Sequence, residues 1–219
     1  MKCPPKTNIL TTILLDLPWT NILGDTWRLF RKLFRGFSQE GIYEVLNYHS
    51  TLELLDSTGT KAHFSKTKKI RYLQDDIIAY QDHAWGDGKI LQNYQCSPGK
   101  AVDRYRSGYK TLILISRREI KNRGDIDKYQ IEWDITDGFL KADGFWATDI
   151  TRRTKKITVE VIFPACRPPY HIVLQESNRR RTHYISRDLI QELPDDRLKV
   201  GISIKNPHLF EHYLLKWRW

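Results

Sequence analysis

Hydrophobic positions recur along this chain with two different periods, and the change falls near residue 41. In "DTWRLFRKLFRGF" (25–37), aromatic and aliphatic residues recur every three or four positions, as on one face of an α-helix. From Ile42 onward, short runs of β-branched, aromatic and apolar residues are separated by turn residues, which is typical of β-strands. The pattern predicts an N-terminal amphipathic helix followed by a β-rich body.

The two faces of the predicted helix differ in chemistry. The apolar face, which we interpret as a docking face, consists of Trp27, Phe30, Leu33, Phe34 and Phe37. The polar face has four basic residues and no acidic one: Arg28, Arg31, Lys32 and Arg35. The apolar face could pack on the chain's own body, whereas the basic face also suits an anionic lipid surface or the groove of a partner. All three interpretations stay open at this point.

The body has the turn density of an antiparallel sandwich or barrel. Turn signals such as "GDG", "SPG", "NRGD", "TDG" and "ADG" separate successive strand-like runs. Two runs alternate clearly enough to predict which residues are buried. We expect one buried face in the run that contains Ile157, Val159 and Val161, and another at the end of the chain in Tyr213, Leu215, Trp217 and Trp219.

The sequence suggests three segments. Residues 1–41 form the helical segment, 42–150 a β-rich domain and 151–219 a sandwich-like module, although 42–219 could equally be one continuous domain. The net charge of +10 is concentrated at the two ends. A surplus of this kind favours an acidic protein partner, nucleic acid or anionic lipid, and says nothing about the fold.

Several kinds of chemistry lack a signature. No phosphate-binding glycine loop, nucleophile elbow or zinc-ligand spacing occurs, and His208 and His212 are better explained as two surface histidines than as metal ligands. We therefore expect no metal and no cofactor. The three cysteines (Cys3, Cys96 and Cys166) form no CxxC pair, which favours a reducing compartment. We expect a cytoplasmic protein without a transmembrane span, with peripheral membrane attachment left open.

One weak catalytic pattern is present. Asp103 precedes a strand that ends in Glu119-x-Lys121, and in metal-dependent nucleases of the PD-(D/E)xK type such carboxylates hold a divalent ion beside a lysine. No PD dipeptide precedes this pattern, and a Glu-x-Lys strand end is common on solvated surfaces. The turn-rich segment 80–110 is a second place where function could lie, since irregular segments on a β scaffold often carry it. Its candidates are His83, Trp85, Asp87, Cys96, Asp103, Tyr105 and Tyr109.

Basic clusters recur next to predicted turns. Those in the last third of the chain are our candidate binding residues: Arg152, Arg153, Lys155, Lys156, Arg179, Arg180 and Arg181. Solubility and protection of strand edges would explain them equally well. If the turns meet on one rim of the body, the clusters would form a surface for phosphates or carboxylates.

These observations favour a non-enzymatic binding or adaptor subunit that docks a protein partner or an anionic surface through its basic ends. A nucleic-acid-binding accessory protein is the alternative, and a metal-dependent nuclease is the third hypothesis.

Overall fold

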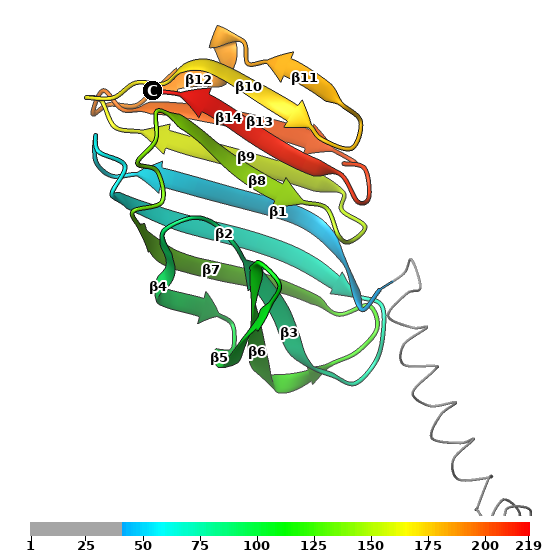
Figure 1. The fold of residues 1–219 in the computed structure, drawn as a ribbon. Helices are drawn as coiled ribbons and strands as arrows, with labels where there is room; N and C mark the ends of the chain where they lie inside the picture. Colours follow the sequence, from blue (N-terminus) through cyan, green and yellow to red (C-terminus); the bar gives the residue numbers. More distant parts are fainter. Residues whose placement is uncertain (1–40) are drawn as a thin grey trace, which may run out of the picture. The chain divides into compact units, whose positions relative to one another are not determined.

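The computed structural model describes residues 41–219 (Figure 1). The predicted helix, with its docking face (Trp27 to Phe37) and its basic face (Arg28 to Arg35), lies outside the described residues. The described part contains fourteen strands and one short 3₁₀ helix, η1 (Arg187–Leu189), so the prediction of a mostly β body is confirmed. Within residues 41–219, no helix is long and apolar enough to cross a membrane.

The largest sheet, here the large sheet, has seven strands in the order β12-β13-β9-β1-β2-β7-β4. Its strands are β1 (Tyr43–Leu54), β2 (Lys61–Tyr72), β4 (Lys89–Ser97), β7 (Ile126–Thr136), β9 (Lys156–Phe163), β12 (Ile190–Glu192) and β13 (Leu198–Lys205).

Two smaller sheets complete the body. The four-stranded sheet has the order β11-β10-β14-β8, with β8 (Asp143–Asp149), β10 (Tyr170–Glu176), β11 (Arg181–Tyr184) and β14 (His212–Arg218). The three-stranded sheet has the order β3-β6-β5, with β3 (Ile77–Ala84), β5 (Lys100–Ser107) and β6 (Lys110–Lys121).

Both smaller sheets pack on the large sheet, as Figure 1 shows. Phe163 of β9 meets Trp217 of β14 edge to face at 5.3 Å between ring centroids, while Tyr129 of β7 stacks on Tyr80 of β3 at 4.2 Å. The four-stranded sheet therefore covers the β9 side of the large sheet, and the three-stranded sheet covers the β7 side. The second layer is divided, and this division positions the candidate site.

One pair of strands departs from the antiparallel pattern. β1 pairs with β9 in parallel, from Tyr48 opposite Ile157 to Glu53 opposite Ile162, while all other paired strands among β1 to β14 are antiparallel. Because β1 and β9 lie on opposite sides of residue 150 in the sequence, the large sheet draws strands from both predicted segments of the body.

The predicted alternation in two strands is confirmed. In β9, Ile157, Val159 and Val161 are at most 2% exposed, whereas the intervening Thr158 and Glu160 are partly exposed. At the end of the chain, the buried residues of β14 and the position after it are Tyr213, Leu215, Trp217 and Trp219. These side chains share one phase of the strand, so they all face the large sheet.

Candidate functional site

A cleft of about 860 Å³ lies where the divided second layer leaves part of the large sheet uncovered. Its floor is formed by inward-facing residues of β1, β2 and β7. One wall is β8 along its whole length, and the other is formed by β3, the start of β6 and the β5–β6 turn. The volume is within the range of sites that hold small molecules or short peptide segments. We call this the central cleft.

Two lysines on the floor come from the regular alternation of β2. Phe64, Lys66, Lys68 and Ile70 occupy the same phase of the strand, so the two lysines point inward together with buried apolar residues. Lys66 is 6% exposed and its Nζ lies 2.6 Å from Oδ1 of Asp82, which is fully buried. Burial opposes charge on both groups, but the Lys66 ammonium holds the pKa of Asp82 below its usual value.

Lys68 has a different environment from Lys66. Its Nζ lies 5.5 Å from the ring centroid of Tyr48 and 5.7 Å from that of Tyr80. Among residues 41–219, no carboxylate lies within 4.0 Å of this Nζ. Lys68 is half-buried, so it presents a cation over two aromatic faces with its charge available to an anionic group.

Aromatic rings line much of the central cleft. Phe64 packs on Trp133 at 4.3 Å and on Trp146 of β8 at 4.5 Å between centroids, so it joins the floor to the wall. Tyr43 lies 5.4 Å from Tyr80 on the other side. Rings of this kind bury large apolar areas with few rotatable bonds, which suits them for holding a ligand.

The β5–β6 turn reaches across one end of the central cleft. Lys110 Nζ donates to Oδ2 of Asp149 at 2.7 Å, and the same ammonium lies over the rings of Trp85 (4.7 Å) and Tyr109 (5.3 Å). Although partial burial opposes its charge, the hydrogen bond to Asp149 raises the pKa of Lys110. This bridge crosses the cleft at the Asp149 end of β8, and the lining continues beyond it to Arg152 and Thr154.

β8 is an edge strand, and its unpaired edge belongs to the wall of the central cleft. Trp219 N donates to Ala142 O and Ile150 N donates to Glu211 O, so the even-numbered residues of β8 direct their backbone groups toward β14. The backbone groups of the odd-numbered residues point the other way: Asp143, Phe145, Ala147 and Asp149. Within residues 41–219, no backbone partner pairs with them on that side.

Seven basic residues predicted from the sequence lie at one end of the four-stranded sheet, and we call them the basic rim: Arg152, Arg153, Lys155, Lys156, Arg179, Arg180 and Arg181. Their common position follows from strand register, because Thr148 of β8, Tyr213 of β14 and Glu176 of β10 are neighbours across the sheet. The connections that follow Thr148 and Glu176 therefore leave the sheet at the same end.

The basic rim is largely uncompensated. In the described part of the chain, only Arg179 has a carboxylate within 4.0 Å, at 3.8 Å from Glu176. Arg152 also belongs to the lining of the central cleft, with its guanidinium 5.5 Å from the centroid of Tyr43. The basic rim thus begins at the Asp149 end of the cleft and extends outward from it.

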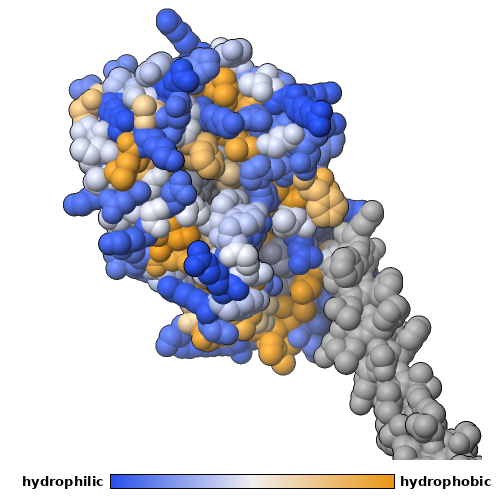
Figure 2. All heavy atoms as spheres, viewed as in Figure 1, coloured by the Kyte–Doolittle hydropathy of each residue, from blue (hydrophilic) through white to orange (hydrophobic). Residues whose placement is uncertain are grey.

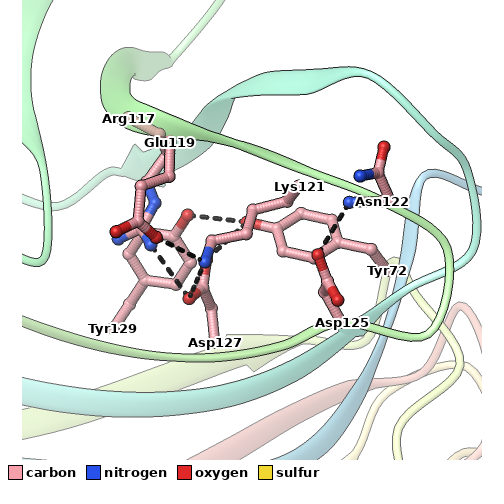
Figure 3. A network of polar contacts seen from close by, with 8 residues as sticks. All are labelled: Tyr72, Arg117, Glu119, Lys121, Asn122, Asp125, Asp127 and Tyr129. Carbon is pink, nitrogen blue, oxygen red and sulfur yellow. Dashed lines mark hydrogen bonds and ion pairs between the residues drawn. The ribbon is translucent and has the colours of Figure 1, made fainter.

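The three residues of the nuclease hypothesis are not brought together. Asp103 lies opposite Leu114 in the β5–β6 pairing, and Glu119 is five positions further along β6, which corresponds to roughly 16 Å of strand. Glu119 instead forms an ion pair with Lys121, with 2.9 Å between Oε2 and Nζ (Figure 3). The Glu119 side chain is 75% exposed. The hydrogen bond between the two side chains raises the pKa of Lys121.

Figure 3 shows that the charged side chains near the end of β6 belong to a network of polar contacts around Asp127. Asp127 accepts hydrogen bonds from Arg117 Nη2 at 3.0 Å and from the Tyr72 hydroxyl at 2.9 Å. The Tyr72 and Tyr129 hydroxyls lie 2.8 Å apart, and Lys121 lies 3.8 Å from Asp127. The buried carboxylate is therefore compensated by protein donors from β2 and β6.

No metal centre is formed within residues 41–219, where no three His, Cys, Asp or Glu side chains gather closely enough to hold an ion. His212 contacts Asp149 through Nδ1, while the backbone N–H of His208 donates to the Tyr213 hydroxyl at 3.3 Å. Cys96 is half-buried and Cys166 is exposed, and both are free thiols.

The central cleft includes some residues that the sequence indicated and others that it did not. Of the candidates in the turn-rich segment, His83, Trp85, Asp87 and Tyr109 line the cleft, whereas Cys96, Asp103 and Tyr105 do not. The sequence indicated Lys66 and Lys68 only as members of a basic cluster (66–71), and it did not single out Trp133 and Trp146 of the lining or Asp82 behind it. The inward orientation of the two lysines could have been inferred from the sequence, because they alternate in phase with the apolar residues Phe64 and Ile70. The high density of lysine in this strand instead favoured a solvent-exposed basic cluster.

No protein-family model and no curated protein matches this chain. Weak likenesses to solved structures exist. An M1 zinc metallopeptidase from Deinococcus radiodurans has a TM-score of 0.48 and 7% identity over 80% of this chain and 42% of the other. A putative protease from Parabacteroides distasonis has a TM-score of 0.47 and 10% identity over 81% of this chain and 40% of the other. The chain spans less than half the length of these proteins, and likenesses of this size establish neither fold family nor activity.

Proposed function

We propose that this protein is a non-enzymatic binding subunit that holds a segment of a partner protein in the central cleft and contacts acidic residues of that partner through the basic rim. The observation that carries the proposal is the continuity between the two surfaces at Arg152, which belongs to both. An apolar cleft leading to an uncompensated basic surface suits a partner that combines apolar and acidic side chains.

The chemistry of the cleft supports binding rather than turnover. The lining residue Lys66 is neutralised by Asp82, which lies buried behind the lining with its Oδ1 2.6 Å from Lys66 Nζ. His83 is stacked on Trp85 at 5.3 Å, and burial, followed by the charges of Lys66 and Lys68, lowers the pKa of His83 to about 3. A histidine held neutral to that extent is a poor acceptor for a proton at neutral pH.

The surface around the site also suits a protein partner. On the face shown in Figure 2, hydrophobic residues form separate patches among hydrophilic ones. Large apolar side chains beside the cleft are exposed, including Phe145 at 51% and Tyr109 at 70%. Aromatic residues ringed by cations are typical of the energetic centre of protein interfaces.

The test begins with peptides. A random twelve-residue phage-displayed library would be selected on the full chain, and the most enriched peptide would be labelled with fluorescein and measured by anisotropy. Lys68→Gln with Arg152→Gln should weaken binding at least tenfold, because both cations face the bound segment. Lys69→Gln with Lys128→Gln is the matched control, since it removes the same charge from the opposite face of the large sheet. Failure to enrich any peptide, or equal affinity for the two double variants, would overturn the proposal.

A further inference from the structure

We infer that the partner segment binds in an extended conformation, as an additional strand along the unpaired edge of β8. This inference rests on the proposed function, because it states how the segment is held in the central cleft. The backbone N–H and C=O groups of Asp143, Phe145 and Ala147 point away from β14, and within residues 41–219 nothing pairs with them. An extended peptide would satisfy them with main-chain hydrogen bonds.

The cleft limits where the added strand can lie. The Lys110 side chain occupies the space beside Asp149, so pairing runs from Asp143 to Ala147 and stops before Asp149. This length of edge accommodates about five residues of an extended peptide, or roughly 16 Å at the rise of a β-strand. A long, regular strand is therefore not required of the partner.

Alternation then predicts the side chains of the bound segment. Every second residue of the added strand would face the floor, where Phe64, Trp133 and Trp146 provide apolar contact. Apolar side chains are favoured at those positions. The intervening positions face away from the floor and tolerate polar residues.

Charge determines the chemistry at one end of the segment. Lys68 and Arg152 lie in the lining of the cleft and have no carboxylate within 4.0 Å among the described residues. The rest of the basic rim continues outward from Arg152. The ligand class is therefore an extended peptide with alternating apolar residues, followed or preceded by Asp or Glu residues at the Arg152 end.

The first arm of the test changes the edge of β8 without changing its charge. Ala147→Pro removes one outward-facing N–H and leaves the hydrogen bonds to β14 in place, because those come from the even-numbered residues. We expect the selected peptide to bind at least tenfold more weakly to this variant. Ala147→Val is the matched control, since it adds volume but keeps the N–H, and it should bind within twofold of the unchanged chain.

The second arm leaves the protein unchanged and therefore does not depend on the folding of the proline variant. Each backbone nitrogen of the selected peptide is methylated in turn. In an added strand, every second N–H points at β8, so affinity should fall at alternate positions. A peptide that lost affinity at consecutive positions, or at none, would overturn strand addition.

The outcomes separate this inference from the proposed function. Loss of binding on Lys68→Gln with Arg152→Gln, combined with full binding by Ala147→Pro and no alternation in the methylation series, would keep the cleft as the site but overturn strand addition. Insensitivity to the charge changes would overturn both. A dimer of the full chain in sedimentation that Ala147→Pro dissociates would identify a second copy as the occupant of the edge, and would likewise overturn the peptide assignment.

Discussion

The ammonium of Lys66 lies 2.6 Å from the carboxylate of Asp82, and both side chains are buried below the central cleft. Because Lys66 belongs to β2 and Asp82 to β3, this pair joins the large sheet to the three-stranded sheet. Tyr94 of β4 adds a hydrogen bond from its hydroxyl to Asp82 Oδ2 at 3.3 Å, and Lys66 lies 5.0 Å from the ring centroid of Trp133. The wall of the cleft is thus fixed to its floor by a buried ion pair.

Removing one partner of this pair should be costly. Asp82→Asn leaves the Lys66 ammonium buried without its counter-charge, and we expect the free energy of unfolding to fall by about 3–5 kcal/mol. Urea denaturation at pH 7 would measure it. The double variant Lys66→Met with Asp82→Asn should recover most of the loss, because no charge stays buried. A loss below about 1 kcal/mol for the single variant would contradict the buried pairing.

His83 should contribute a pH dependence to stability. Burial, together with Lys66 and Lys68, lowers its pKa from 6.5 to about 3 in the folded chain. The unfolded chain therefore binds the proton first as the pH falls. The contribution of neutral His83 is complete above pH 6.5 and declines below it, with a slope of up to about 1.4 kcal/mol per pH unit.

The difference in unfolding free energy between the unchanged chain and His83→Gln, measured from pH 5 to 7.5, would test this dependence. We expect His83→Gln to show the weaker loss of stability toward pH 5. Both proteins share every other titratable group, so the difference between their stability curves reports on the histidine. Parallel curves for the two proteins would show that His83 is accessible to protons in the folded state.

Gly144 should tolerate no side chain. A Cβ at this position of β8 would lie 2.5 Å from Cε2 of Trp217, which is 2% exposed and cannot move without displacing the core. We expect Gly144→Ala to cost about 1–3 kcal/mol through overpacking. Gly201→Ala is the control, because there the nearest atom outside the neighbouring residues is Cγ of Glu160 at 3.6 Å. Equal melting temperatures for the two variants would mean that Trp217 has room to shift.

The basic rim should give the protein salt-sensitive affinity for a polyanion, which also tests the nucleic-acid-binding alternative. We expect changing Arg179, Arg180 and Arg181 to serine to weaken binding to a twenty-base single-stranded DNA. The slope of log affinity against log salt should decrease by about 0.7 for each phosphate that the variant no longer neutralises. The same three positions changed to lysine keep the charge and should keep the slope. A slope unchanged by the serine substitutions would exclude these arginines from binding the polyanion.

Local sequence patterns predicted the strands well, because alternation depends only on which side chains face the core. The buried phases of β9 and β14 follow directly from Ile157, Val159 and Val161 and from Tyr213, Leu215 and Trp217. These features require no knowledge of distant partners.

The central cleft was not predictable in the same way, because it arises between elements that are distant in sequence. The phase of β2 indicates that Lys66 and Lys68 face inward. It does not show that Lys66 meets Asp82, or that Lys68 faces an open cleft. Nor does the sequence of β8 reveal that its outer edge lacks a neighbour. Both facts depend on how the second layer is divided, which is decided by tertiary packing.

The parallel pairing of β1 with β9 also governs the order in which the chain can fold. Thr51 and Glu160 are neighbours in the two strands although they are 109 residues apart. The contacts at the middle of the large sheet therefore form only after a long loop has closed, and topologies of this kind fold on the millisecond-to-second scale. During synthesis from the N-terminus, β1 can pair with β2 long before β9 emerges. The other edge of β1 then stays unpaired until β9 (Lys156–Phe163) has been synthesised. In this interval the nascent chain is most exposed to aggregation through that edge.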